Sequence, residues 1–194
     1  MFYDRPDLTR LCHAESRRLV LRILFVCTGN ICRSPMAERL AVAYSQHLAL
    51  PDLLISSAGT RGMVGHPIHP HAATVLEQLG GDPSDFSARK LTMRVATEAD
   101  LVLTMTREHR QAVLELAPRQ LHKTFTLAEA ARLASEHDSG SVAELATLRS
   151  HSPASKAYDV ADPIGQSLDV FASIGSQIAE LLPPVLELCQ RSKV

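Results

Sequence analysis

Residues 22–38 read RILFVCTGNICRSPMAE, and this stretch decides the fold. It begins with a short apolar run, Ile23 to Val26, which is typical of a strand buried on both faces. Residues 28–30, Thr-Gly-Asn, then suit a tight loop. In the Ser34–Pro35 pair, serine predicts a helix cap, and proline suits the first helical position, where its missing N–H costs nothing. The sequence therefore predicts a buried strand that delivers Cys27 into a loop at the start of a helix.

The predicted loop has the composition of an anion site. Backbone N–H groups in such a turn point inward, and the helix N-terminus adds positive potential. Arg33 contributes a planar, permanently charged guanidinium that matches phosphate oxygens. A Cys27 thiolate would be stabilised in this field and would face the bound anion as a nucleophile. The Cys-x5-Arg-Ser-Pro spacing thus favours a catalytic cysteine over a buried structural one, and the other common phosphate-loop motifs do not occur.

Composition narrows the class of protein. The chain has 194 residues, 45% of them hydrophobic, with a formal net charge of -1, so a single soluble domain without nucleic-acid or membrane binding is expected. No apolar run has membrane-spanning length, and the first residues lack a signal-peptide core. The four cysteines fit neither a disulfide framework nor a zinc site, which favours the reducing cytoplasm. They are Cys12, Cys27, Cys32 and Cys189.

Predicted helices and strands alternate along the chain. Strands are expected at 23–26, 53–58, 100–105 and 121–126, and helices at 35–50, 71–79, from 106, at 127–135, 141–148 and 168–188, with Pro183–Pro184 disturbing the last. This alternation predicts an α/β three-layer sandwich with a parallel sheet. Residues 1–20 precede the first strand as an N-terminal extension, either a loose tail or a short helix. Residues 21–194 are expected to form one domain.

The segment Val26–Pro35 resembles the phosphate loop of the low-molecular-weight protein tyrosine phosphatases. Two further segments resemble the family. They are Ser57–Thr60, which is followed by Gly65 and Pro67, and residues 106–110. The resemblance implies a four-stranded parallel sheet in the order 2-1-3-4 with a flavodoxin-like core. The loop would then lie at the carboxyl end of the first strand, where open α/β sheets bind ligands.

The resemblance also implies roles for individual residues. Cys27 would attack phosphorus, and Arg33 with the loop backbone would hold the phosphate. Asp162, before a proline, stands at the position of the family's general acid and base, and Asp159 is its nearest competitor. The remaining phosphate-binding positions are Thr28, Gly29, Asn30, Ile31, Cys32 and Ser34. Among these, Ser34 would donate to the thiolate, and Asn30 would hold the loop in shape with Ser57 as partner.

No cofactor or metal is implied by this chemistry. The histidines at 66, 69 and 71 invite a metal interpretation, but they lack thiolate or carboxylate partners at ligand spacing, so exposed loop histidines are expected.

Two positions and one segment depart from the pattern of the family. Phe86 stands where many relatives carry a histidine beneath the loop, which predicts a different support for Asn30. Ile164 follows Asp162–Pro163 where an aromatic residue is usual, and residues 60–64 offer no aromatic side chain. The missing aromatic side chains should leave the phosphate chemistry unaffected, but they should weaken binding of a phosphotyrosine ring.

Three rival functions remain. An arsenate reductase on the same fold needs further cysteines for disulfide exchange, and residues 80–110 contain none. Protein arginine phosphatases tend to carry threonine where this chain has Ile31, which favours the tyrosine phosphatases. A non-catalytic phosphate-binding module is disfavoured because every catalytic group is present. The expected partner is a phosphorylated protein, for which bacterial relatives suggest a tyrosine kinase.

Overall fold

The computed structural model describes residues 20–50, 52–136, 141–149 and 159–191. The predicted extension at residues 1–20, apart from Val20, lies outside the described residues, and so does Cys12. The described chain forms β1 (Leu21–Cys27), α1 (Arg33–His47), β2 (Leu53–Gly59), α2 (Pro70–Gln78), α3 (Met93–Thr97), β3 (Leu101–Thr104), α4 (Arg107–Leu116), the 3₁₀ helix η2 (Pro118–Lys123), β4 (Thr124–Thr126), α5 (Leu127–Glu136), α6 (Val142–Arg149) and α7 (Leu168–Arg191).

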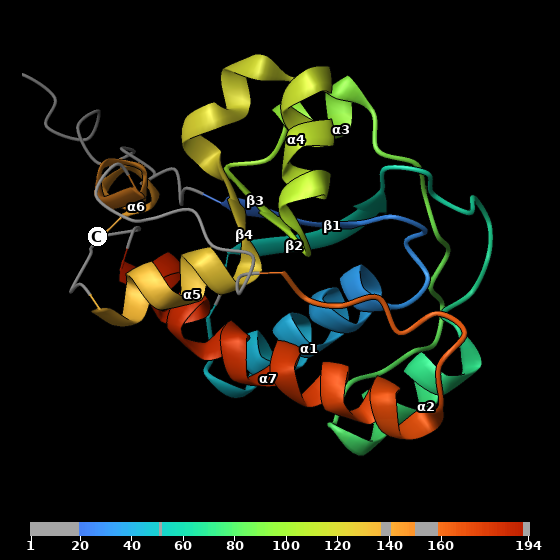
Figure 1. Ribbon diagram of the computed structural model, residues 1–194. Helices are drawn as coiled ribbons and strands as arrows, with labels where there is room; N and C mark the ends of the chain where they lie inside the picture. Colours follow the sequence, from blue (N-terminus) through green and yellow to red (C-terminus); the bar gives the residue numbers. More distant parts are fainter. Residues whose placement is uncertain (1–19, 51, 137–140, 150–158, 192–194) are drawn as a thin grey trace, which may run out of the picture.

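The four strands form one parallel sheet in the order β2-β1-β3-β4, as predicted. Helices α1, α2, α5 and α7 cover one face, and α3 and α4 cover the other (Figure 1). The three-layer α/β sandwich is therefore confirmed.

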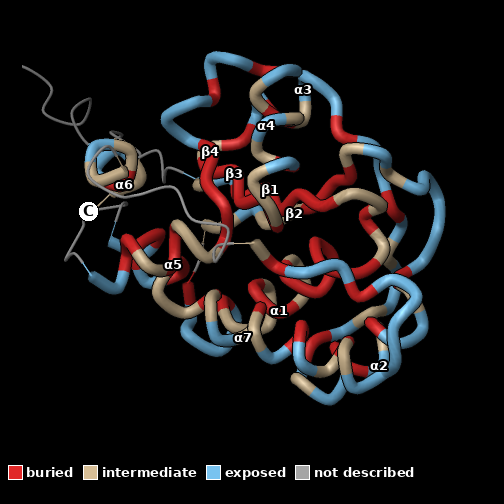
Figure 2. The backbone as a smooth tube through the Cα atoms, viewed as in Figure 1, coloured by how far each residue is buried: buried red, intermediate tan, exposed pale blue. Residues whose placement is uncertain are grey.

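Strand β1 is buried on both faces, because its side chains alternate between two hydrophobic clusters. Ile23, Phe25 and Cys27 join the cluster beneath α1 and α7. Leu24 and Val26 join the smaller cluster on the opposite face. Figure 2 shows the resulting continuous buried core along the strands. Burial on both faces is what the uninterrupted apolar run predicts for a central parallel strand.

Helix α1 starts two residues earlier than expected. It begins at Arg33, its N-cap is Cys32, and no side chain caps it. The prediction that Ser34 caps this helix was wrong, because the serine hydroxyl is used in the loop instead. Pro35 occupies the third helical position, which still lies in the first turn and so needs no N–H donor.

Two further predictions are corrected, one for the segment before β4 and one for α7. Residues 121–123 are not strand: Pro118 begins a 3₁₀ helix, held where the Gln120 amide donates to the Thr97 carbonyl and the Thr124 hydroxyl donates to the Gln120 carbonyl. Helix α7 continues through Pro183–Pro184 to Arg191. Packing of its apolar stripe against α1, α2 and α5 sustains the helix where two backbone donors are missing.

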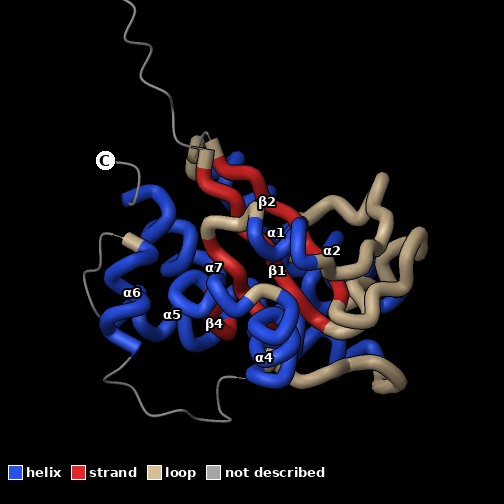
Figure 3. Tube along the Cα trace, turned by 90° about the horizontal axis from the view of Figure 1, so that it is seen from above, coloured by secondary structure: helices blue, strands red, loops and turns tan. Residues whose placement is uncertain are grey.

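Loops and turns gather beyond the carboxyl ends of the strands, as seen from above in Figure 3. The loop after β1 therefore shares this end of the sheet with the loops after β2 and β3. No helix in the described part of the chain is long and apolar enough to cross a membrane.

Candidate active site

The loop after β1, residues 27–33, is tied along its outer side to the loop after β2. The carbonyls of Cys27, Thr28, Gly29 and Ile31 accept hydrogen bonds of 2.8–2.9 Å from the N–H groups of Thr60, Arg61, Met63 and His69. In a trans peptide the N–H points opposite to the carbonyl, and the described residues contain no cis peptide. The N–H groups that follow these carbonyls therefore point away from the outer loop, which is the geometry of an anion-binding nest.

Two glycines let the outer loop pack closely against its neighbours. A Cβ atom on Gly59 would lie 2.5 Å from the carbonyl oxygen of Thr28, and one on Gly62 would overlap the backbone of Arg89. A side chain at Gly59 would push the outer loop away from the anion-binding loop, and one at Gly62 would push it away from the segment that carries Arg89.

The Cys27 sulfur lies inside the nest. The Asn30 N–H points at Sγ from 3.3 Å, and Asn30 adopts a left-handed φ of 57°, which asparagine tolerates. The Ser34 hydroxyl lies 3.0 Å from Sγ, the contact that the sequence suggested for the thiolate. Both groups can stabilise negative charge on sulfur.

Beneath the loop, Asn30 is held by a buried network. Its Nδ2 donates to the hydroxyls of Ser57 at 2.7 Å and Ser34 at 3.0 Å, and its Oδ1 accepts the Arg89 N–H at 2.8 Å. The Ser57 hydroxyl in turn donates to Glu38 at 2.5 Å. Burial raises the pKa of the Glu38 carboxyl, against the opposing hydrogen bond from Ser57.

This network explains how the loop is supported without a histidine at position 86. Phe86 packs instead beneath the Arg39 guanidinium, whose central carbon lies 5.6 Å from the ring centroid. Glu38 and Arg89 thus anchor Asn30 and Ser57, as the expectation of a different support required.

Arg33 and Asp162 meet although 129 residues separate them in the sequence. Arg33 Nη2 donates to Asp162 Oδ2 at 2.5 Å, and Nη1 donates to the Val160 carbonyl at 3.1 Å. The Arg33 side chain is only 4% exposed, whereas that of Asp162 is 48% exposed. Arg33 Nε is buried without a hydrogen-bond partner among the described residues, so this donor remains available for an oxyanion.

Asp159 lies elsewhere. Its Oδ1 accepts the Arg107 N–H at the start of α4 at 2.8 Å, and it does not line the cavity above Cys27. Asp159 thus fixes the segment that carries Asp162, which is the better placed of the two carboxylates for chemistry at the sulfur.

A cavity of about 460 Å³ opens above the loop. Its floor is formed by the loop itself, and its walls come from Arg61, Met63, His69 and Ile164, with Asp162 at the edge. Of the three histidines expected to be exposed, His69 is half-buried and stacks on Phe171 with ring centroids 5.0 Å apart. No group of three or more metal-ligating side chains occurs in the described ranges.

The profile of a family described as low molecular weight phosphotyrosine protein phosphatase matches residues 22–140, more than half of the chain. The chain belongs to this family. The family profile ends at residue 140 and does not cover Asp162. The position of its carboxylate in the site of this phosphatase-family protein therefore comes from the structure alone.

Known proteins agree with this assignment. The low molecular weight protein-tyrosine-phosphatase Etp of Escherichia coli K12 is 43% identical over 103 residues, which span 53% of this chain and 66% of Etp. A phosphatase structure from T. tengcongensis is 32% identical with a TM-score of 0.70, covering 86% of this chain and 98% of that one. The YwlE arginine phosphatase from Geobacillus stearothermophilus is 30% identical with a TM-score of 0.68, covering 88% and 93%.

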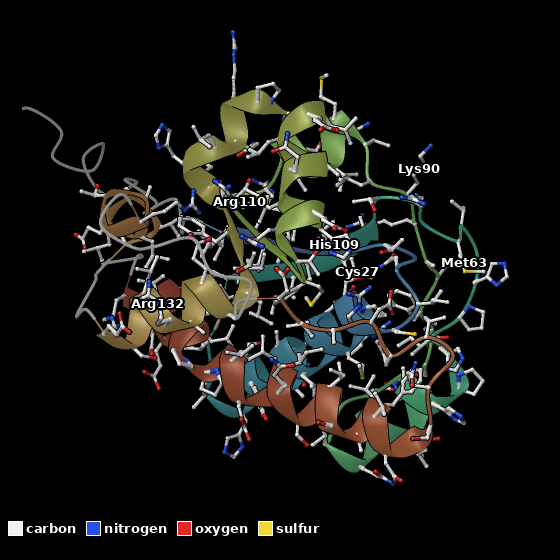
Figure 4. The ribbon with its side chains drawn as sticks, viewed as in Figure 1. Cys27, Met63, Lys90, His109, Arg110 and Arg132 are labelled. Atoms are coloured by element: carbon white, nitrogen blue, oxygen red, sulfur yellow. The ribbon has the colours of Figure 1, made fainter. Side chains whose placement is uncertain are left out.

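Sequence reasoning missed one residue of this phosphatase-family site. His109 projects from α4 toward the loop that carries Cys27 (Figure 4), and its Nε2 lies 2.8 Å from the Thr28 hydroxyl. The Thr106-x-x-His spacing could have placed this side chain over the first turn of a helix. Its partner Thr28 is 81 residues away, so the sequence alone gave no signal for the contact.

Proposed function

We propose that this protein hydrolyses phosphotyrosine in proteins through a phosphocysteine intermediate on Cys27. The observation that carries the proposal is the arrangement around one sulfur atom. Cys27 Sγ lies within a nest of N–H groups, beside a buried arginine and beneath a cavity with an aspartate at its edge. That combination supplies a nucleophile, an oxyanion site and a proton donor.

In the first step, the Cys27 thiolate attacks phosphorus and forms an S–P bond while the bond from phosphorus to the phenolic oxygen breaks. Asp162 gives its proton to the departing oxygen, so tyrosine leaves neutral. The loop N–H groups and Arg33 hold the three equatorial oxygens and stabilise the charge of the transition state.

In the second step, water attacks the phosphocysteine and the S–P bond breaks. Asp162, now a carboxylate, takes the proton from water, and inorganic phosphate leaves with the thiolate restored. Ser34 and the Asn30 N–H are placed to stabilise that thiolate as leaving group. Neither step requires a cofactor.

Phosphoarginine is a second candidate substrate, because more than one similar structure is that of an arginine phosphatase. Against it stands Ile31, whose side chain lines the cavity where arginine phosphatases tend to carry threonine. Arsenate reduction is less well supported. Besides Cys27, the described cysteines are Cys32 in the same loop and Cys189 in α7.

We further propose a phosphorylated protein as substrate, with a bacterial tyrosine kinase as one candidate, and a cytoplasmic location. Bacterial relatives named protein-tyrosine-phosphatases support the first proposal. The second rests on chemistry, since a nucleophilic thiol persists best in a reducing compartment.

The deciding experiment is turnover by the purified protein. Release of p-nitrophenol from p-nitrophenyl phosphate tests the chemistry, and a panel of phosphotyrosine, phosphoserine, phosphoarginine and sugar phosphates tests the substrate. Hydrolysis of phosphotyrosine above the others is expected. Phosphate binding without any turnover would instead support a non-catalytic phosphate-binding module.

A further inference from the structure

His109 is a buried imidazole that the proposed mechanism does not use. The residue is 7% exposed, and each ring nitrogen contacts a threonine hydroxyl from a different segment. Nε2 lies 2.8 Å from Thr28 Oγ1 in the anion-binding loop, and Nδ1 lies 2.9 Å from Thr106 Oγ1 before α4. The ring thus bridges the loop after β1 and the loop after β3.

The first turn of α4 fixes the position of the ring. Thr106 is the N-cap, and its hydroxyl also accepts the backbone N–H of His109 at 3.2 Å. The side chain three residues after an N-cap lies over the start of its helix. His109 therefore projects from a rigid element toward the loop, which makes it a fixed support.

Burial and the nearby charges favour an uncharged ring. Burial, together with the positive charge of Arg33, lowers the pKa of His109 to about 4, although the negative charges of Asp162 and Asp159 oppose this change. A neutral imidazole carries one donor and one acceptor. One threonine hydroxyl thus receives a hydrogen bond from the ring while the other donates to it, whichever tautomer is present.

Thr28 is consequently held from two sides. His109 binds its hydroxyl, and the Arg61 N–H donates to its carbonyl at 2.9 Å. These two contacts fix the peptide plane that leads to Gly29, whose N–H points away from the outer loop and into the nest. Gly29 lacks a side chain that would restrain this peptide by itself.

We propose that His109 is a positioning residue for the phosphate site, acting through Thr28 on the direction of the first N–H groups of the loop. The proposal rests on the proposed function for its kinetic consequences but not for phosphate binding. Loss of the contact should weaken the hold on inorganic phosphate and on the transition state together, by about three- to ten-fold, the range of one hydrogen bond.

Two substitutions of the same residue separate positioning from folding. A glutamine amide can reach the place of Nε2 and the Thr28 hydroxyl, whereas an asparagine amide reaches only the place of Nδ1 near Thr106. His109→Asn should therefore lower kcat/KM for p-nitrophenyl phosphate and phosphate affinity three- to ten-fold, and His109→Gln should restore most of both. His122→Asn, at an exposed histidine in η2, is the matched control and should leave both unchanged.

A double-mutant cycle with Thr28→Val completes the test. If His109 acts through Thr28, Thr28→Val alone should show a similar loss, and the double variant Thr28→Val/His109→Asn should be no worse than either single variant. Losses that multiply would overturn the proposal, as would unchanged phosphate affinity in His109→Asn. Phosphate affinity is measured by calorimetry. A wild type that binds phosphate without turning over aryl phosphates would refute the proposed function and leave this cycle intact.

Discussion

The guanidinium of Arg33 and the carboxylate of Asp162 form an ion pair of 2.5 Å at the edge of the cavity above Cys27. One partner is buried and the other is half-exposed, so Asp162 can turn toward a substrate while Arg33 stays in place. The Val160 carbonyl holds Arg33 from behind at 3.1 Å. A bound phosphate would therefore compete with Asp162 for the same guanidinium.

Replacing Asp162 tests its role as proton donor. Asp162→Asn should lower kcat for p-nitrophenyl phosphate by about two to four orders of magnitude, the usual range for general acid catalysis. The loss should shrink for more acidic leaving groups. A loss that is equal across leaving groups would point to another acid, and Asp159→Asn would then be the variant to measure.

The same substitution should also strengthen phosphate binding. Asp162→Asn removes the anion that occupies Arg33, so inorganic phosphate should protect this variant against thermal unfolding more than it protects the wild type. Weaker protection would show that Asp162 contributes to the oxyanion site rather than competing with it.

Cys27 and Arg33 should differ in what their loss removes. Cys27→Ser should abolish turnover and still bind phosphate, because a serine hydroxyl is a far weaker nucleophile while the loop donors remain. Arg33→Ala should lose both affinity and rate, since its contacts strengthen in the transition state. Single-turnover assays and phosphate calorimetry measure the two effects. Wild-type rates in Cys27→Ser would refute the phosphocysteine mechanism.

The sequence predicted the parts of this site that are local in the chain. An unbroken apolar run from Ile23 to Val26 identifies a strand buried on both faces, and the residues after it identify the loop. Asp162 was placed only by resemblance, because proximity across 129 residues leaves no periodic signal. The contact between His109 and Thr28 was missed for the same reason. Likewise, the residue types around Ser34 predicted a helix cap, whereas the contact of its hydroxyl with the sulfur, which the structure shows, was expected only from the resemblance.

Stability should fall on acidification from about pH 6.5 to about pH 4 because of His109. The pKa of His109 in the folded protein is lowered from 6.5 to about 4. Between these two pH values the histidine is therefore protonated in the unfolded chain but not in the native state. Stability then rises with pH and is lost as pH falls, by at most about 3 kcal/mol. Glu38 acts oppositely, because burial raises its pKa and protonation then favours the native state.

Urea unfolding of the wild type and His109→Gln across pH 4–7.5 isolates the histidine contribution, since Glu38 is common to both proteins. The free energy of unfolding should depend less steeply on pH in the variant. Parallel curves would contradict an uncharged, buried His109.

Cys32 should protect Cys27 from overoxidation. Both thiols lie in one loop, and a sulfenic acid on Cys27 can condense with the Cys32 thiol to a disulfide and water. Burial and the neighbouring Cys27 raise the pKa of Cys32 to about 12, so Cys27 is the thiol that peroxide attacks first. Mild peroxide followed by reductant should restore wild-type activity and should restore Cys32→Ser poorly. Equal recovery of activity in the wild type and in Cys32→Ser would show that Cys32 does not protect Cys27.

The cavity walls predict weak binding of the phosphotyrosine ring. Ile164 and Met63 line the cavity and remain 48% and 43% exposed, and no tyrosine, phenylalanine or tryptophan is among the lining residues within the described chain. An aromatic wall contributes about 0.5–1.5 kcal/mol beyond the area that it buries. Wild-type KM for phosphotyrosine peptides should therefore be high, with kcat set by ordinary leaving-group chemistry.

An aromatic side chain at position 164 should strengthen binding of the phosphotyrosine ring. The Ile164 N–H donates to Asp162 Oδ1 at 3.3 Å, so a side chain at this position stands next to the proposed acid and beside the ring. Ile164→Tyr should lower KM for phosphotyrosine peptides about two- to ten-fold with little change in kcat, the pattern of uniform binding. Leu168→Tyr, exposed at the start of α7 and outside the cavity, is the matched control. A low wild-type KM that Ile164→Tyr leaves unchanged would show that the aliphatic walls already bind the ring well.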